Sequence, residues 1–394
     1  MTLEQQDKQY VLQTYARNYT NFVKGIGSTL YDEDGKDYID FASGIGVNSV
    51  GHGNQSLANA ICEQAKSIIH ISNLQVIEPQ TKLAEKIVQL SGYDMGVFFA
   101  NSGAEANEGA IKIARKYGKT KFDNKRYKII TLEHSFHGRT ITTVKATGKE
   151  DFHTPHFSPY PDGFSYERSI EDVYGAIDDE TIAVLIELVQ GEGGVQPFEK
   201  DQIQKLANHL GKEGILLIVD EVQTGVFRTG EFLASNLYEI EPDIITLAKG
   251  LAGGVPIGAV MTKHKDILCA GDHGSTFGGN YLSTSASLAV LEVLEEMYDN
   301  GTLAEAHLYF EQKLEFIAKK YSNLFEKEVG LGLMRGLRAK NVEIQSNIVK
   351  NCMREGLIVL KAGKNTVRFL PSLTISKSEI DEGFKRFETV INNI

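Results

Sequence analysis

Two apolar runs, each ending at a charged residue, are the feature that most constrains the fold of this chain. Residues 215–219 are followed directly by Asp220, and residues 244–248 are followed by Lys249. A strand that is rich in Ile, Leu and Val throughout is covered on both faces, which is typical of a parallel sheet. Right-handed crossovers bring the carboxyl ends of such strands to one edge, where ligands bind. The sequence therefore predicts that Asp220 and Lys249 face a common site.

Apolar runs alternate with helical periodicity between about residues 95 and 262. A helix is expected over 199–210, where Ile203, Leu206 and Leu210 share one face and Gly211 is the expected stop. Strands are expected at 95–100, 128–133, 182–187, 215–219, 243–248 and 256–261. This alternation predicts an α/β domain with a mostly parallel sheet.

The pattern changes after about residue 283, which indicates a second and smaller α+β unit. Helices are expected at 283–299, at 303–321 and from 377, with short strands at 333–338, 357–360 and 366–370. A hairpin is expected near the N-terminus, at 29–31 and 37–41. We predict an N-terminal segment (1–50) that packs with the small domain, a large α/β domain (51–290) and a small C-terminal domain (291–394).

Composition excludes several classes of protein. The net charge of −11 argues against a nucleic-acid-binding groove. The three cysteines form no CxxC pair, which fits reduced thiols in a cytosolic protein. The first residues show no basic segment followed by an apolar one, and no run of about 18 apolar residues occurs. We therefore expect a cytoplasmic protein with no membrane or nucleic-acid partner.

Residues 101–108 follow a predicted strand and open a predicted helix. Ser102 and Glu105 have the spacing of a capping box. The helix start would offer free N–H groups, and Gly103 would allow an anion to approach closely, which suits a phosphate. No Lys-Ser/Thr pair follows at P-loop spacing, so a nucleoside triphosphate is not expected. Taken alone, the motif also fits an ordinary capped helix.

Residues 134–139 form a second motif after a strand. Phe136 could stack on a planar ring, and Arg139 could bind a carboxylate. His134 and His137 have no Cys or carboxylate partner at metal-ligand spacing, so no metal site is predicted.

Three further features are ambiguous from the residues alone. Glu192 lies among glycines that would let it approach a ligand or an arginine. The glycine-rich segment 274–280, which includes Ser275 and Thr276, could contact phosphate or be a simple turn. Arg368 lies in an alternating strand and could be an ordinary surface residue.

A lysine that forms a Schiff base and an acid that keeps a pyridine nitrogen protonated are what pyridoxal 5'-phosphate (PLP) chemistry requires. With the motifs above, in this order, the chain resembles the class III (ω-amino) aminotransferases, PLP enzymes of fold type I. The resemblance extends from about residue 15 to 390. It implies a large α/β domain with a mostly parallel sheet of the seven-stranded type, a small α+β domain and a homodimer with shared active sites.

The resemblance also implies roles for individual residues. Lys249 would be the Schiff-base lysine and the proton shuttle, Asp220 would pair with the pyridine nitrogen, and Thr276 would reach the phosphate from the neighbouring subunit. The residues implied to contact the cofactor are Ser102, Gly103, Ala104, Phe136, Asp220, Glu221, Val222, Gln223, Lys249 and Thr276.

For the substrates, the resemblance implies that Arg139, with help from Ser275, holds the far carboxylate. Arg368 would bind the α-carboxylate of glutamate, and Glu192 would neutralise Arg368 when the other substrate is present. Residues 42–48 resemble family members that act on acetylornithine, in which Gly44, Ile45 and Val47 leave room for an acylated nitrogen. The implied reaction moves the δ-amino group of N2-acetyl-L-ornithine to 2-oxoglutarate.

Other functions are also compatible with parts of the sequence. Within the family, the donor could be ornithine, succinylornithine, succinyl-diaminopimelate or 4-aminobutyrate. A Rossmann-type nucleotide-binding protein is disfavoured, because 25–27 and 330–332 lack a third glycine at the required spacing. A binding or scaffold protein would need no lysine at position 249.

Overall fold

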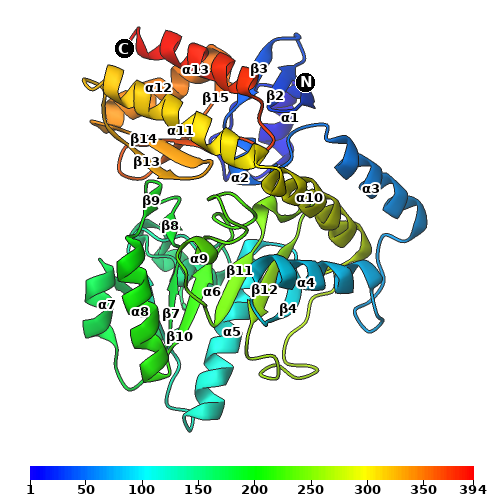
Figure 1. The fold of residues 1–394 in the computed structure, drawn as a ribbon, viewed down its shortest axis with the longest axis vertical. Helices are drawn as coiled ribbons and strands as arrows, with labels where there is room; N and C mark the ends of the chain where they lie inside the picture. The colour runs from blue at the N-terminus through cyan, green and yellow to red at the C-terminus, as the bar shows by residue number, and fades with distance from the viewer.

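The computed structural model describes residues 1–394, and its largest element is a seven-stranded sheet with helices on both faces (Figure 1). The strand order is β4-β12-β11-β10-β7-β5-β6. In that order the bounds are Gly96–Ala100, Gly258–Thr262, Ile244–Leu247, Leu216–Asp220, Thr181–Ile186, Lys128–Leu132 and Phe164–Glu167. Only β12 runs antiparallel to its neighbours β11 and β4. The predicted α/β class and mostly parallel sheet are confirmed.

Strand β6 has no counterpart among the predicted strands. It lies at the edge of the sheet, where all four residues are only half-buried. An edge strand of this kind has no continuous apolar run, so the pattern that identifies the inner strands does not occur in it.

Two helices, α3 and α4, precede the first strand of this sheet in the chain, and five more lie between its strands. Their bounds are Gln55–Ser67 (α3), Glu78–Ser91 (α4), Gly103–Lys121 (α5), Ile141–Ala146 (α6), Ile170–Ala176 (α7), Lys200–Glu213 (α8) and Ala234–Leu237 (α9). Short 3-10 helices span Glu150–Phe152 (η1), Pro155–Phe157 (η2) and Lys249–Ala252 (η3), and a two-stranded ribbon pairs Val189–Gln190 (β8) with Gln196–Pro197 (β9).

The predicted stop of helix α8 at Gly211 is wrong. The helix continues through Gly211 and is capped by Gly214, whose φ of 66° lies in the left-handed region. Glycine inside a helix costs only about 1 kcal/mol relative to alanine, so Gly211 does not end α8. The helix ends at Gly214, because the left-handed conformation of the cap favours glycine.

Two four-stranded sheets form the rest of the fold. The first has the order β1-β2-β3-β15, with bounds Phe22–Ile26, Thr29–Asp32, Asp37–Asp40 and Leu357–Ile358. The second has the order β13-β14-β17-β16, with bounds Phe325–Leu331, Met334–Ala339, Thr366–Phe369 and Leu360–Ala362. The predicted N-terminal hairpin is present as β2 and β3, and β3 pairs in parallel with β15 from the C-terminal part of the chain. The domain limits at 50 and 290 stay a prediction.

The predicted strand at 357–360 is in fact two strands. Residues 357–358 pair with β3 in one sheet, whereas 360–362 pair with β17 in the other. Strand β13 was not predicted, because charged, exposed positions interrupt its apolar residues.

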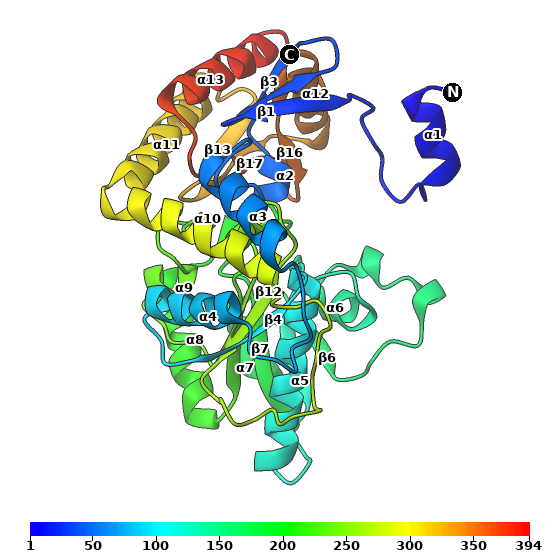
Figure 2. The ribbon, with the colours of Figure 1, turned by 90° about the vertical axis from the view of Figure 1, so that its right-hand side faces the viewer.

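Helix α10 (Tyr281–Asp299) connects the two halves of the fold and packs against α3, α4 and η3 (Figure 2). Three helices pack against the small sheets: Thr302–Lys320 (α11), Val342–Arg354 (α12) and Lys377–Ile391 (α13). Helix α1 (Leu3–Tyr10) lies apart from the rest and has no buried residue, and Ser43–Gly46 (α2) is a short turn beside η3. None of the helices combines the length and the apolar character that a membrane crossing needs.

Candidate active site

The carboxyl ends of β10 and β11 bring the two predicted catalytic residues to one cavity. Asp220 pairs in register with Thr246, and Lys249 follows three residues later at the start of η3. Both side chains line a cavity of about 410 Å³. Other predicted residues that line it are Ser102, Gly103, Ala104, Phe136, Arg139, Val222 and Gln223.

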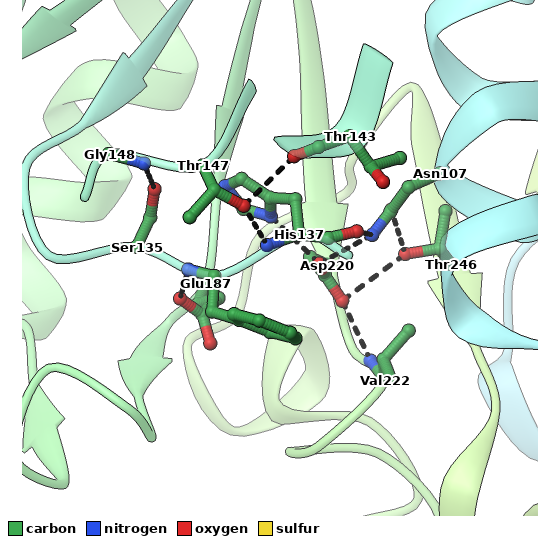
Figure 3. Close-up of polar contacts among 11 residues, drawn as sticks. Asn107, Ser135, His137, Thr143, Thr147, Gly148, Glu187, Asp220, Val222 and Thr246 are labelled. Carbon is green, nitrogen blue, oxygen red and sulfur yellow. Dashed lines mark hydrogen bonds and ion pairs between the residues drawn. The ribbon is translucent and has the colours of Figure 1, made fainter. Parts of the chain in front are cut away.

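Asp220 is buried, and its carboxylate accepts hydrogen bonds from several neighbouring groups (Figure 3). Its Oδ2 accepts from Asn107 Nδ2 and lies 2.8 Å from His137 Nδ1, and its Oδ1 accepts from the Val222 amide at 3.0 Å. Burial alone would raise the pKa of Asp220, but the hydrogen bonds from His137, Asn107 and Val222 outweigh it and lower the pKa below the ordinary value. Asp220 is therefore held as a carboxylate.

His137 and Asn107 are held in turn by neighbouring groups. The His137 amide donates to Thr147 Oγ1 at 2.9 Å, and Asn107 Nδ2 also donates to the His137 carbonyl at 2.8 Å. Thr246 Oγ1 donates to Asn107 Oδ1 at 2.8 Å, which fixes the orientation of the amide. The strand-end motif at 134–139 was predicted from the sequence, but this role of His137 was not.

Lys249 has the properties of a reactive amine. Burial, with the nearby charge of Arg368, lowers the pKa of Lys249 to about 8. Its φ of 41° lies in the left-handed region, which costs a non-glycine residue about 1–3 kcal/mol. At pH 7 on the order of a tenth of the amine is therefore unprotonated and nucleophilic, far more than for an ordinary lysine.

The start of α5 forms an anion site at one end of the cavity. Ser102 is the N-cap, and its Oγ accepts from the Glu105 amide at 3.2 Å. The amides of Gly103 and Ala104 belong to the first turn, where N–H groups have no partner inside the helix. A Cβ on Gly103 would lie 2.7 Å from a methyl carbon of Val222, so only glycine fits there. This end of the cavity suits a phosphate.

The predicted capping box at Ser102 and Glu105 is only half formed. The Glu105 carboxylate accepts from the backbone and side-chain nitrogens of Asn101, at 2.7 and 2.8 Å, rather than from the Ser102 amide. Asn101 itself lines the cavity, so Glu105 orders the residue before the N-cap instead.

Phe136 is placed against the cavity by Glu187. The Phe136 amide donates to Glu187 Oε2 at 3.0 Å, and burial raises the pKa of Glu187 to about 7. No role was predicted for Glu187, although it is the last residue of the strand expected at 182–187. Its position at a strand end was the signal that could have identified it.

Arg368 and Glu192 form an ion pair, with 2.6 Å between Nη1 and Oε1. Arg368 is 2% exposed, and its Nε has no hydrogen-bond partner. Burial raises the pKa of Glu192, but Arg368 more than compensates and holds it below its ordinary value. Arg368 Nη1 also lies 3.4 Å from Gln223 Oε1, which links the pair to the cavity wall.

Arg139 is exposed and has no carboxylate partner. Its guanidinium carbon lies 3.9 Å from the centre of the Phe152 ring and 5.7 Å from that of Phe136. A cation stacked on aromatic rings at the mouth of the cavity is placed to bind an incoming carboxylate.

Five predicted site residues do not line this cavity: Glu192 and Arg368, which form the ion pair, and Glu221, Ser275 and Thr276. Glu221 is turned to α9, where its carboxylate accepts from Ser235 and from the Ala234 amide, so its side chain is a helix cap instead of a cofactor ligand. Ser275 and Thr276 line a second cavity, of about 850 Å³. Ser275 Oγ accepts from Asn101 Nδ2 at 3.1 Å, which connects the two cavities.

The residues at the site fit PLP. Lys249 would hold the aldehyde carbon and Asp220 the ring nitrogen, while Phe136 would cover the ring. The amides at the start of α5 would bind the phosphate. The buried Asp220 carboxylate and the Lys249 amine, which lines the cavity, would both gain a partner from this cofactor.

Comparisons with known proteins agree with this geometry. The model of the aminotransferase class III family matches residues 13–391. An acetylornithine aminotransferase from Wolinella succinogenes is 60% identical over 98% of this chain and 99% of that protein. One from Methanocaldococcus jannaschii is 46% identical over 98% and 97%. A succinylornithine transaminase from Yersinia pseudotuberculosis is 40% identical over 98% and 95%.

Solved structures of similar proteins show the same fold. The ornithine aminotransferase from Toxoplasma gondii, described with partial occupancy of PLP at its active site, has a TM-score of 0.92 at 30% identity and covers 100% of this chain and 95% of that one. The N-acetylornithine aminotransferase from Stenotrophomonas maltophilia has a TM-score of 0.83 at 31% identity, with 99% of each chain covered. The chain therefore belongs to the class III aminotransferases, which are PLP-dependent enzymes.

Proposed function

We propose that this enzyme transfers the δ-amino group of N2-acetyl-L-ornithine to 2-oxoglutarate, giving N-acetyl-L-glutamate 5-semialdehyde and L-glutamate. The choice of N-acetylornithine as the donor is based on the similarity to acetylornithine aminotransferases over nearly the whole chain. This reaction would place the enzyme in arginine biosynthesis.

PLP, when bound, supplies an aldehyde that takes up the amino group and a ring that accepts the electrons of the broken C–H bond. Asp220 would keep the ring nitrogen protonated, because its own carboxylate stays ionised in the network with His137 and Asn107. Lys249 Nζ would take up the proton that leaves the δ-carbon of the donor and would act as the proton shuttle. General acid–base help of this kind contributes about a hundred- to ten-thousand-fold.

Two substrates of different charge must use one site. Glutamate carries a carboxylate beside its reacting carbon, whereas the δ-carbon of acetylornithine carries none. Arg368 would bind this carboxylate of glutamate. When that carboxylate is absent, Glu192 would pair with Arg368; the 2.6 Å ion pair supports this. Without this partner, the buried guanidinium would be an unpaired charge, which costs several kcal/mol.

Arg139 would bind the far carboxylate of both substrates, with a contribution from Ser275. The acyl group of the donor would lie near residues 42–48, of which Val47 lines the cavity. Gly44 and Ile45 have φ values of 65° and 67°, so this turn follows a left-handed path that shapes the entrance.

We further propose that the working unit is a cytoplasmic homodimer, in which Thr276 of each chain contacts the phosphate in the partner's site. The position of Thr276 in the second cavity, away from Lys249, supports this proposal.

Succinylornithine is the second candidate donor, because the succinylornithine transaminase from Yersinia pseudotuberculosis covers the same length of chain. Ornithine, succinyl-diaminopimelate and 4-aminobutyrate are further alternatives. The purified enzyme should be assayed with each amine and 2-oxoglutarate. We expect the highest kcat/KM with N-acetylornithine; a higher value for another amine would overturn the proposed donor.

A further inference from the structure

Lys149 lies beside the Arg368–Glu192 pair and has no role in the chemistry described above. Its Nζ is 3.9 Å from Glu192 Oε2 and 3.5 Å from the Glu192 carbonyl oxygen. Arg368 contacts the other carboxylate oxygen, Oε1. Glu192 therefore lies between two cations, one on each oxygen.

The backbone on both sides of this contact is fixed. Gly148, the residue before Lys149, donates its amide to Ser135 Oγ at 2.9 Å, and a Cβ there would lie 1.9 Å from the Leu132 carbonyl oxygen. The Glu192 carbonyl accepts from the Gly363 amide at 2.9 Å. The backbone next to Lys149 and at Glu192 is thus held in place, so that the two side chains start from fixed positions.

The side chains of Lys149 and Glu192 are only 25% and 28% exposed. Lys149 Nζ also lies 5.6 Å from the centre of the Phe152 ring, on which Arg139 stacks. Burial lowers the pKa of Lys149, and the charges of Glu192 and Glu187 act against this shift. The amine is therefore in a partly desolvated site, where a carboxylate partner stabilises its charged form.

A substrate carboxylate that binds Arg368 must displace Glu192. The displaced carboxylate would be left in a mostly buried position without a cation unless another one lies within reach. Lys149 is that cation on the Oε2 side. We propose that Lys149 is a positioning residue that receives Glu192 when a dicarboxylate occupies Arg368, and so favours the glutamate and 2-oxoglutarate half-reaction.

This inference rests on the proposed function, and glutarate allows it to be tested separately. Glutarate is a five-carbon dicarboxylate without a keto group, so it binds without reacting. Its dissociation constant for the PLP-loaded enzyme would be measured by calorimetry for the wild type, Lys149→Gln, Glu192→Gln and the double variant. Binding of glutarate does not depend on which amine is the donor, so a wrong donor would leave this test intact.

We expect Lys149→Gln to weaken glutarate binding about fivefold in the wild-type background, as a partly buried ion pair would. In the Glu192→Gln background, where no carboxylate has to be received, the same change should have an effect of about twofold or less. Lys149→Arg keeps the cation and should restore binding to within about threefold of wild type.

Lys145 provides a matched control. It lies on α6, its Nζ is 5.9 and 5.6 Å from the ring centres of Tyr160 and Tyr166, and it has no acidic partner. Lys145→Gln removes the same charge and should change glutarate binding about twofold or less. An equal loss for Lys149→Gln in both backgrounds would show a direct charge effect and overturn the proposal, as would no loss at all.

Discussion

His137 Nδ1 lies 2.8 Å from Asp220 Oδ2, and the two side chains are 0% and 4% exposed. A buried carboxylate needs such donors, because burial alone would favour its protonated form. The network of His137, Asn107 and the Val222 amide therefore decides the protonation state of the residue that faces the cofactor ring.

His137→Ala should destabilise the protein by about 1–3 kcal/mol, because it leaves a buried carboxylate oxygen with one donor fewer. Urea unfolding of the apoenzyme measures this free energy. His156→Ala, at an exposed position, is the control and should change the stability by about 0.5 kcal/mol or less. Equal stability of the two variants would show that the contact with Asp220 is not important.

The same network sets a pH dependence. Because the pKa of Asp220 is lowered in the folded protein, its contribution to stability is present above the ordinary value of 3.8 and is lost as the pH falls through the lowered one. In His137→Ala the pKa rises, so the acid limb of the stability curve should move to higher pH. A limb that stays in place in urea titrations at several pH values would contradict the assignment.

The reactivity of Lys249 should follow its lowered pKa. The rate at which the apoenzyme captures PLP should rise as the pH passes about 8 and level off above it, since the neutral amine is the nucleophile. Stopped-flow absorbance gives this profile. A rate that keeps rising through the ordinary lysine value of 10.5 would show that burial does not tune this amine.

Arg368→Ala should damage the glutamate half-reaction far more than the acetylornithine one. Loss of a buried, hydrogen-bonded partner of a substrate carboxylate costs about 2–5 kcal/mol. Single-turnover assays of each half-reaction separate the two. Equal losses in both would refute the exchange of Glu192 for a substrate carboxylate.

Gly103→Ala should weaken PLP binding by about tenfold, equivalent to about 1.4 kcal/mol. The new Cβ would lie 2.7 Å from a Val222 methyl group, which displaces the first turn of α5. Gly103→Ala combined with Val222→Ala should recover affinity. Gly211→Ala, in α8 with no atom within 4 Å of its Cβ, is the control and should leave PLP affinity unchanged. Titration of the apoenzyme with PLP gives these constants.

The sequence was sufficient to bring Asp220 and Lys249 to one site, although it did not identify Glu187 at another strand end. Asp220 and Lys249 end apolar runs, so a periodicity argument places them at one sheet edge. His137 was not assigned its role, because its partner is 83 residues away in the chain and no local pattern records that contact. Glu221 was assigned to the cofactor, but adjacent residues of an extended chain point in opposite directions, and its carboxylate caps α9.

The weaker predictions failed for related reasons. Strands β6 and β13 contain partly exposed or charged positions, and their pairing partners stabilise them more than their own composition does. The helix stop at Gly211 was a local inference, and the left-handed conformation that ends α8 is adopted by Gly214 instead.

Covalent trapping of PLP tests the central assignment most directly. The PLP-loaded enzyme would be reduced with borohydride and digested, and the labelled peptide would be identified by mass spectrometry. We predict a single label on Lys249. A label on another lysine, or no label in a protein that has bound PLP, would contradict the account.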